Sequence, residues 1–532
     1  MHRNLRVALS LISLAFAGCT SNPKAKIDEA ADLAEQRRGQ RPAWTEAPEA
    51  VPPDWSTAVV LPMDETVALA LRNNRTLRAD LEMIGQADAE LLQASLMQNP
   101  MISFMVMFPD GGGRSMLRGT GIPIQPLQDL WLIPFRKKAA TAMLQQAVLR
   151  VADRAIETAA TVKAAYVKLQ YTQRAIALLQ ENMRLAEQSA QLVQSRQVAG
   201  QATQVAYNLA HIRYQRLRSE LLTMESEYRT LQRELLALVG FAGAPDRWTV
   251  QPVHEMQDEL RPPRGEDALV ALGAAQRLDL KAAEWSTQAA EQRIALMRAE
   301  GLPDLALGFS FERAPATRAA RGPTIPARVG NATAQALANQ VYGVKPMAQA
   351  PALAPWQPKI REVKWTLGPM IDLEIPLFDQ NQAQVAKAMH EYNQKLAEYE
   401  GRVQDATRDI RAAQVRQQQA VEQVRFYRTE IMPEVQRNLE LAQQAFITGQ
   451  EGLTVYLQAQ DDLIMTRRTI LEFLRDYYLS GVELERAVGG RIGTDPAALS
   501  PGEGEVPAKP PQTPGTTAAS PPADEVSHEH TE

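Results

Sequence analysis

The sequence is poor in the residues from which catalytic and metal sites are commonly built. It has one cysteine and six histidines among 532 residues. The HExxH, CxxC, Walker and GxGxxG patterns are all absent, so no catalytic or nucleotide site can be assembled from it. His528 and His530 flank Glu529 near the end of the chain, but such a pair in a polar tail is typical of solvated sequence. We therefore expect no enzyme activity, no cofactor and no metal site.

An excess of one charge and long hydrophobic runs are also missing. Lys and Arg number 57 against 62 Asp and Glu, and a net charge of −5 gives no reason to expect nucleic acid as a partner. No run approaches 18 apolar residues, so the sequence predicts no transmembrane helix, and any bilayer crossing would fall to β-strands. Aromatic residues make up 6%, and the abundance of Ala, Gln, Leu, Arg and Glu favours long helices and coiled coils.

The first 18 residues have the features of an export signal. A short basic region precedes an apolar stretch, residues 7–16, and small residues then precede Cys19. The segment resembles a bacterial lipoprotein signal, although Phe16 stands where leucine is usual. This resemblance implies that Cys19 is the acylated first residue of the mature chain, and Thr20 after it favours the outer membrane. An ordinary cleaved signal with an incidental cysteine is the alternative.

The chain repeats itself. The repeated segments are residues 99–104 and 302–307, 131–134 and 373–376, 200–201 and 449–450, and 239–240 and 488–489. The offset is 203 (303 − 100) for the first pair, 242 (376 − 134) for the second and 249 (449 − 200) for the last two. It grows by 39 residues in a Pro/Ala-rich stretch and by 7, one heptad, in a long helix. The pattern predicts two copies of a unit made of strand, loop, strand and long helical hairpin.

Long helices are predicted in both copies. Apolar residues alternate in steps of three and four on both arms of the first hairpin. These residues are Ile176, Leu179, Met183, Ala186, Ala190 and Val193 on one arm, and Leu217, Leu221, Met224, Tyr228, Leu231, Leu235 and Leu238 on the other. Residues 137–199 would span about 95 Å as a helix, far more than the ~30 Å hydrocarbon core of a bilayer. Such a length is typical of a structure that crosses the periplasm. The second hairpin is expected over about 382–488 with a kink at Pro433, and one earlier helix over about 64–98 is expected to begin at Asp64 or Thr66.

Alternating segments predict four strands. In residues 101–108, 304–312 and 365–375 apolar side chains lie on one face and mostly polar or small ones on the other. The fourth strand, residues 117–127, is expected as the segment that returns after the first, although it carries Gly119, Gly121 and Pro123. This pattern is typical of outer-membrane strands, although a half-buried strand of a soluble sandwich has the same period. Met101, Met105 and Met107 share the less apolar face, where thioethers could serve Cu(I), but simple space filling is the favoured interpretation.

These features predict five segments. They are a lipoprotein signal (1–18), an N-terminal tether that wraps the body (19–60), a first repeat (61–245), a second repeat (246–492) that contains an extended external loop (313–363), and a disordered Pro-rich tail (493–532).

Over about residues 60–490 the sequence resembles the TolC-like outer-membrane efflux proteins. The resemblance rests on residues 66–74, 375–379, 448–450, 455–460 and 484–489, which occur in the order and at the spacing of that family. It implies a mostly α fold with a β-barrel part. In a homotrimer, each protomer would give four strands to a shared outer-membrane barrel and two hairpins to a long α-barrel. It also implies a passive export duct, opened by a periplasmic adaptor and energised by an inner-membrane pump. The chain would be lipid-anchored in the outer membrane, in contact with its lipid, with the helices in the periplasm.

The hairpin tips are the predicted functional sites. Gly200 and Gly449 would supply the positive φ of tight reversals. The predicted adaptor contacts are Gly200, Gln201, Ala202, Thr203, Gly449, Gln450 and Leu453. Bulky residues at Ala202, Thr203 or Leu453 are expected to block docking and leave folding intact.

A periplasmic gate is expected beside the second tip. Many family members carry a ring of aspartates there, but the matching positions, Val455 and Gln458, are uncharged, and Asp461 and Asp462 follow them.

The main alternative function is a coiled-coil envelope lipoprotein without a pore. Such a protein would have no use for two pairs of strands. A porin-like uptake channel is disfavoured because porins lack ~95 Å helices. The sequence does not specify the cargo, the pump or the adaptor.

Overall fold

The computed structural model describes residues 21–44, 59–99, 101–107, 116–241, 248–252, 260, 264–318 and 360–492. All that follows concerns the compact unit that ends at Arg491. Its helices are α2 (Lys24–Arg38), α3 (Met63–Asn73), α4 (Arg75–Ser95), α5 (Asp129–Val198), α6 (Gln204–Val239), α7 (Glu266–Gln276), α8 (Leu278–Glu300), α10 (Gln382–Phe426), η2 (Tyr427–Ile431), α11 (Met432–Thr448) and α12 (Leu453–Val488). Its strands are β1 (Val59–Leu61), β2 (Met101–Met107), β3 (Met116–Pro126), β4 (Trp248–Val250), β5 (Asp304–Arg318) and β6 (Ile360–Glu374).

The unit consists of two copies of one arrangement, as the repeats predict. The helix pair α3 and α4 and strand β2 precede their counterparts α7, α8 and β5 by 203 residues (266 − 63). From the end of β3 the offset is 248 (374 − 126), and at the hairpin turns it is 249 (449 − 200). The added residues therefore lie between the paired strands. The predicted heptad insertion is wrong, because residues 131–134 lie inside α5 whereas residues 373 and 374 end β6.

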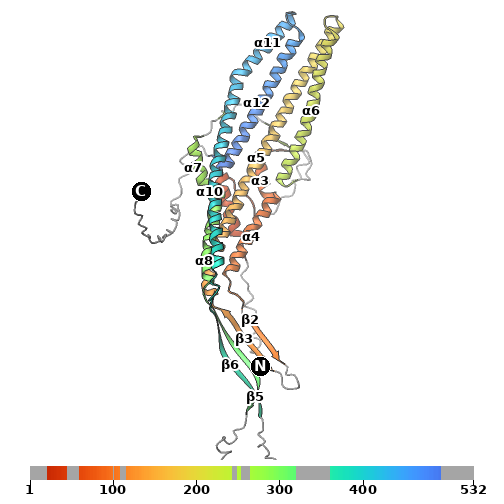
Figure 1. Cartoon of the computed structure of the whole chain (residues 1–532). Helices are drawn as coiled ribbons and strands as arrows, with labels where there is room; N and C mark the ends of the chain where they lie inside the picture. The colour runs from red at the N-terminus through yellow and green to blue at the C-terminus, as the bar shows by residue number, and fades with distance from the viewer. Residues whose placement is uncertain are drawn as a thin grey trace, which may run out of the picture. The chain divides into compact units, whose positions relative to one another are not determined.

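Two long helical hairpins dominate the unit (Figure 1). α5 has 70 residues, about 105 Å at 1.5 Å per residue, and it begins at Asp129, before Pro134 rather than after it. The predicted seams of the first hairpin are buried or half-buried throughout, which confirms the heptad interpretation. In the second hairpin the π-turn η2 ends at Ile431, two residues before Pro433, and interrupts the α-helical hydrogen bonding, as expected near a proline inside a helix.

The single helix predicted over about 64–98 is instead two helices, α3 and α4, that meet at Asn74. The Asn74 side chain accepts a hydrogen bond from the Leu77 amide at 3.1 Å and so caps α4. Its Nδ2 donates to the carbonyl of Leu238 at 2.9 Å, near the end of α6. The second copy repeats this joint, because Arg277 between α7 and α8 donates to the carbonyl of Ala487 at 2.9 Å near the end of α12. A tertiary contact therefore divides into two helices a segment that apolar periodicity alone predicts to be one helix.

The strands form a four-stranded antiparallel sheet in the order β2-β3-β5-β6. Opposite residues of β5 and β6 share a face. One face carries the pairs Leu305 and Leu373, Leu307 and Ile371, and Phe311 and Leu367, and the other carries Asp304 and Glu374, Ala306 and Asp372, and Glu312 and Thr366. The pairing confirms the predicted alternation. It also extends both strands into residues 313–318 and 360–363, so the predicted loop bounds were too wide.

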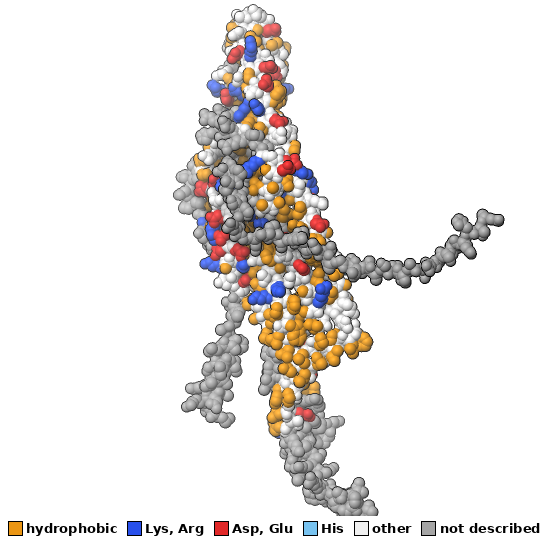
Figure 2. Space-filling model, turned by 90° about the vertical axis from the view of Figure 1, so that its left-hand side faces the viewer, with side chains coloured by type: hydrophobic (Ala, Val, Ile, Leu, Met, Phe, Trp, Pro, Cys, Tyr) orange, Lys and Arg blue, Asp and Glu red, His pale blue; other side chains and the backbone are white. Residues whose placement is uncertain are grey.

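The apolar face of this sheet is exposed along β6 in the protomer. Leu367, Ile371 and Leu373 expose 62%, 66% and 56% of their surface, and hydrophobic side chains gather over this part of the chain in Figure 2. No helix in the described part of the chain combines the length and the apolarity needed to cross a bilayer.

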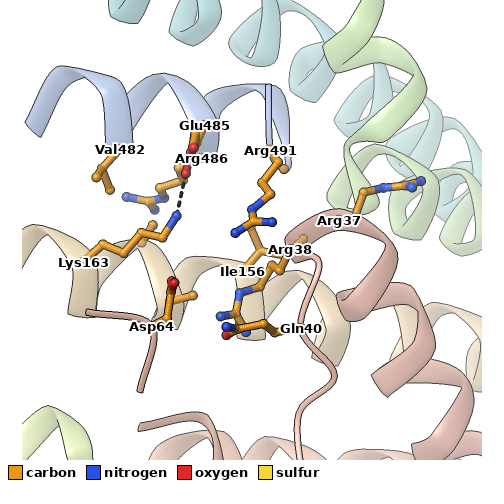
Figure 3. Close-up of a pocket in the computed structure, with 13 residues that line it drawn as sticks. Arg37, Arg38, Gln40, Asp64, Ile156, Lys163, Val482, Glu485, Arg486 and Arg491 are labelled. Atoms are coloured by element: carbon orange, nitrogen blue, oxygen red, sulfur yellow. Dashed lines mark hydrogen bonds and ion pairs between the residues drawn. The ribbon is translucent and has the colours of Figure 1, made fainter. Parts of the chain in front are cut away.

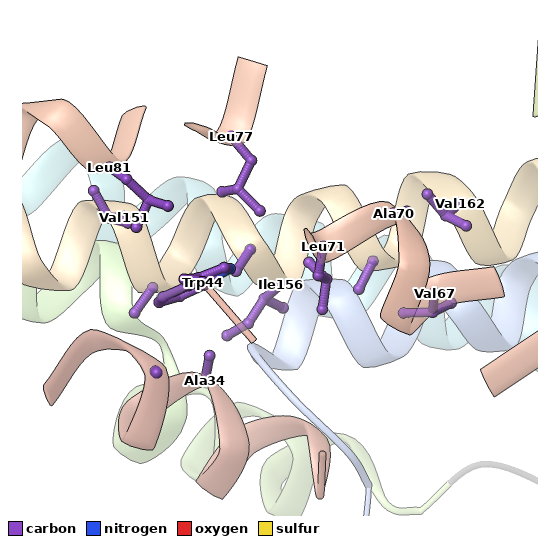
Figure 4. Packing of buried hydrophobic residues seen from close by; sticks show 14 of the residues in the cluster. Ala34, Trp44, Val67, Ala70, Leu71, Leu77, Leu81, Val151, Ile156 and Val162 are labelled. Carbon is purple, nitrogen blue, oxygen red and sulfur yellow. The ribbon is translucent and has the colours of Figure 1, made fainter. Parts of the chain in front are cut away.

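The main core lies where the N-terminal segment meets α3, α4 and α5. Trp44 is 5% exposed and belongs to the same buried cluster as Leu71, Ile156 and Ala34 (Figure 4). The predicted tether therefore packs on the body, and it contains a helix, α2, that was not foreseen. The apolar side of α2 consists largely of alanines, Ala30, Ala31 and Ala34, which give little amphipathic signal. A second feature not foreseen is the short parallel pairing of β1 with β4.

Candidate functional site: the hairpin tips

The two tips have the same backbone geometry. Gly200 and Gly449 have φ of 75° and 76°, the left-handed conformation expected for these turns. The Gln201 amide donates to the Arg196 carbonyl at 2.8 Å, and the Gln450 amide donates to the Ala445 carbonyl at 2.9 Å. Both residue pairs are related by the 249-residue offset. Gln201 and Gln450 are exposed at the two turns, so their side chains are available to a partner.

Other predicted tip residues join the two hairpins to each other. Leu453, the first residue of α12, packs with Ala202 against a small buried cluster of the first hairpin. The cluster comprises Ala190, Val193 and Ala210. Thr203 caps α6, because its Oγ1 accepts from the Ala206 amide at 3.2 Å. Bulky residues at Ala202 or Leu453 would therefore disturb the contact between the hairpins, contrary to the sequence-based expectation that folding would be untouched.

A polar link follows the apolar contact along the same two helices. Arg213 of α6 donates from Nη1 to Gln460 Oε1 of α12 at 2.8 Å, and its Nη2 lies 2.8 Å from Asp461 Oδ1. The Arg213 side chain is 12% exposed. Burial lowers the pKa of Arg213 below its ordinary value, and the charge of Asp461 opposes that shift. Asp461 is thus directed at the first hairpin.

An aromatic contact also spans the tips. The guanidinium of Arg196 on α5 lies 4.5 Å from the ring centroid of Phe446 on α11, within cation–π distance. Phe446 in turn stacks on Tyr456 with centroids 5.4 Å apart, and Gln460 donates to the Tyr456 hydroxyl at 2.6 Å. Arg196, Arg213, Phe446 and Gln460 were not identified from the sequence. No sequence pattern relates these four residues to one another, and only the pairing of the two hairpins brings them together.

The remaining gate residues form a stripe on α12. Val455, Gln458 and Asp462 follow steps of three and four, and Met465 continues the stripe by another three. All four are exposed, and Asp462 accepts a hydrogen bond from Gln458 at 3.0 Å. One carboxylate per chain, that of Asp462, therefore belongs to this stripe, and Asp461 lies outside it.

Cys19 lies outside the described residues, so its acylation remains a prediction. In the described part of the chain, no group of three or more His, Cys, Asp or Glu residues is arranged to hold a metal ion.

Comparison with known proteins adds to this geometry. A family model described as outer membrane efflux protein matches residues 269–490. Over these residues the chain is similar to the outer membrane efflux proteins. The resemblance inferred from the sequence is thereby confirmed, because the matching family is that of the outer membrane efflux proteins.

Solved structures extend the similarity to the first half. A membrane protein from Pseudomonas aeruginosa is 21% identical with a TM-score of 0.61, and the match covers 85% of this chain and 98% of that one. CusC, described in terms of transmembrane channel formation, is 19% identical with a TM-score of 0.62 and the same coverage. VceC from Vibrio cholerae is 16% identical with a TM-score of 0.59, over 80% of this chain and 96% of that one. At these identities the matches show a shared fold. No curated protein matches.

Proposed function

We propose that this outer membrane efflux protein is the trimeric export duct of a tripartite efflux or secretion system. The observation that carries the proposal is the combination, in one unit, of hairpins about 100 Å long with a sheet whose apolar face is bare. A bare apolar sheet face is stable in lipid but costly in water. A spacer protein without a pore would need the hairpins but not the sheet.

Closure of the sheet requires other copies of the chain. Both edge strands, β2 and β6, have one neighbour each among the described residues. Unpaired edges are not tolerated in hydrocarbon. In the proposed trimer, β6 of one protomer pairs with β2 of the next, and twelve strands close a barrel.

The proposed gate lies at the opposite end of the hairpins. Leu453, the Arg213 link and the Arg196 contact hold the second hairpin against the first, and the stripe from Val455 to Met465 would line the constriction. An adaptor that packs against Gln201 and Gln450 would replace contacts between the hairpins with its own and dilate the end. The transport energy would come from an inner-membrane pump, and acylation at Cys19 would add a second membrane anchor.

Disulfide cross-linking tests the closure of the sheet. In a Cys19→Ser background, Met105→Cys on β2 is combined with Thr366→Cys, Gly368→Cys or Met370→Cys on the same face of β6. At least one pair should give a covalent trimer on oxidation in the membrane. The control, Leu367→Cys, lies on the other face and should cross-link poorly. Monomers throughout would reject the shared barrel.

Photo-cross-linking tests the tips. A photoreactive residue at Gln201 or Gln450 should capture a periplasmic adaptor in cells, whereas one at Arg408, on the exposed middle of α10, should not. Equal capture from all three positions would place the docking site elsewhere.

A further inference from the structure

A small basic cavity lies far from the tips, where the N-terminal segment meets the end of α12. It is lined by the last turn of α2, by α5 and by residues 482–491, and its volume is about 30 Å³. Figure 3 shows basic side chains that enter it from three separate segments. One ordered water needs about 10–15 Å³ on this measure, so the cavity can hold more than a single water.

The charge of the lining is strongly positive. Five basic residues line the cavity, namely Arg37, Arg38, Lys163, Arg486 and Arg491, against two carboxylates, Asp64 and Glu485. Lys163 pairs with Glu485 at 2.7 Å, and Arg486 pairs with Glu157 outside the cavity at 2.6 Å. Arg37 donates to the Gln276 carbonyl at 3.0 Å.

Arg38 and Arg491 are the two basic residues of the lining to which none of these contacts belongs. Neither forms an ion pair within the described residues. Nη1 of Arg38 is shut off from solvent and has no hydrogen-bond partner there. Burial, followed by the charge of Arg491, lowers the pKa of Arg38 to about 10, and the charges of Asp64 and Glu485 oppose that shift. A buried guanidinium donor without an acceptor, close to a second guanidinium, is an unfavourable arrangement that an anion would relieve.

We propose that this cavity binds a small tetrahedral oxyanion of the phosphate class between Arg38 and Arg491. Two planar guanidinium groups can offer paired donors to the oxygens of such an ion, which a point charge such as chloride would use less well. Arg491 lines the cavity and is exposed, so its side chain can move to admit the ion. The bound ion would join the N-terminal segment to the end of α12, where the Arg491 amide already donates to the Arg37 carbonyl at 2.9 Å.

A purely structural role for the arginines makes a different prediction. The last turns of α2 and α12 both carry basic residues, and cations there interact favourably with the helix dipole. If that were their role, Arg38→Gln would lower the Tm in chloride, and phosphate would have no specific effect. If the cavity is an anion site, the variant should be at least as stable as wild type in chloride, because a buried repulsive charge is removed.

Direct binding of inorganic phosphate decides between them. Equilibrium dialysis of labelled phosphate against the full chain in detergent, at fixed ionic strength in chloride, should show one saturable site per protomer. Arg38→Gln and Arg491→Gln should each weaken binding at least tenfold, while Arg408→Gln on exposed α10 should bind as wild type does. Phosphate should also raise the Tm of wild type over chloride and leave that of Arg38→Gln unchanged.

Either of two results would overturn the proposal. One is the absence of saturable phosphate binding to wild type, and the other is equal affinity in wild type and both arginine variants. If Arg38→Gln does not fold, the exposed Arg491→Gln gives the same comparison. The test does not depend on channel activity. The anion site can therefore be rejected while the export function holds, and the export function can be rejected while the anion site holds.

Discussion

At the scale of single residues, two charged side chains held away from water have the clearest consequences. Arg213 links the hairpins at the tips. Asp153 lies on α5 beside the joint between α7 and α8, and burial raises its pKa to about 7, with Asp279 adding to the shift and Arg277 opposing it. Substitution of Arg213 tests the proposed gate, and substitution of Asp153 tests the pH dependence of stability.

Asp153 should make the protein less stable as the pH rises. Its pKa in the folded chain, about 7, lies above the ordinary value of 3.8, so the folded state binds the extra proton between these values. Stability contributed by the protonated form is therefore full below about pH 4 and is lost as the pH rises through 7, by at most about 4 kcal/mol. Asp153→Asn should flatten this part of the curve and stabilise the protein at pH 7.5. Denaturant unfolding of the wild type and of Asp153→Asn between pH 4.5 and 7.5 measures this difference. If the free energy of unfolding changes with pH in the same way in both proteins, the raised pKa does not belong to Asp153.

Loss of the Arg213 link should loosen the closed tips. Arg213→Gln removes the bonds to Gln460 and Asp461, at a cost of about 1–3 kcal/mol for a mostly buried, charge-assisted contact. Under the proposed function, the resting conductance in planar bilayers should rise, and Asp461→Asn should act in the same direction. Asp462→Asn, on the exposed stripe, is the matched control and should leave the link intact. If Asp462→Asn opens the channel and Arg213→Gln does not, the closing contact has been misplaced.

At the scale of elements, duplication governs the architecture down to single hydrogen bonds. The contact of Asn74 with the Leu238 carbonyl and that of Arg277 with the Ala487 carbonyl are counterparts at offsets of 203 and 249. The donor side chains differ in size and charge, yet both fix the end of a long helix onto the break in a helix pair. What the two copies share is thus a joint between elements rather than a residue type.

Two glycines at the joints and two at the tips share a left-handed backbone conformation but differ in the space around them. A Cβ at Gly240 would lie 2.7 Å from the Asn73 carbonyl oxygen, and one at Gly489 would lie 2.9 Å from Arg277 Cα. A Cβ at Gly200 or Gly449 meets nothing within 4 Å. Alanine at the tips should therefore cost only the conformational strain, about 1–2 kcal/mol, whereas alanine at the joints should cost about 1–3 kcal/mol more. Denaturant unfolding of the four variants measures this, and equal losses would show that the joints do not constrain the helix ends.

The two faces of β6 should differ in their tolerance of charge. Leu373 lies on the apolar face and Asp372, its neighbour in sequence, lies on the other. Leu373→Arg should cost about 2–4 kcal/mol if the residue sits near the bilayer midplane, while Asp372→Arg should insert normally and alter the conductance. The yield of heat-resistant trimer in outer membranes reports the difference. Comparable yields from both variants would invalidate the assignment of faces.

The sequence predicted the features that depend on local periodicity and missed those that depend on tertiary contact. The duplication, the heptad seams, the turns at Gly200 and Gly449 and the strand faces could all be read from spacing. The break at Asn74, the alanine-faced helix α2 and the strand ends beyond residue 313 could not, because packing partners determine each of them. At the tips the same limit applies, since Leu453 and Arg213 matter through contacts with the other hairpin.

At the scale of the whole molecule, the central claim is that this chain conducts. The unit presents a sheet whose edge strands have one neighbour each among the described residues, and a pair of hairpins joined at their tips. Under the proposed function, copies of the chain assemble around an axis, with the sheets in the membrane and the tips forming a closure. A structural envelope lipoprotein would share the long hairpins but not the channel.

Single-channel recording from the purified, heat-modifiable trimer tests this claim most directly. The wild-type protein should insert into planar bilayers with a low resting conductance, and the Arg213→Gln variant should open to a larger and stable conductance. A folded trimer that inserts but never conducts, in either protein and under any opening condition, would contradict the account and favour the structural alternative.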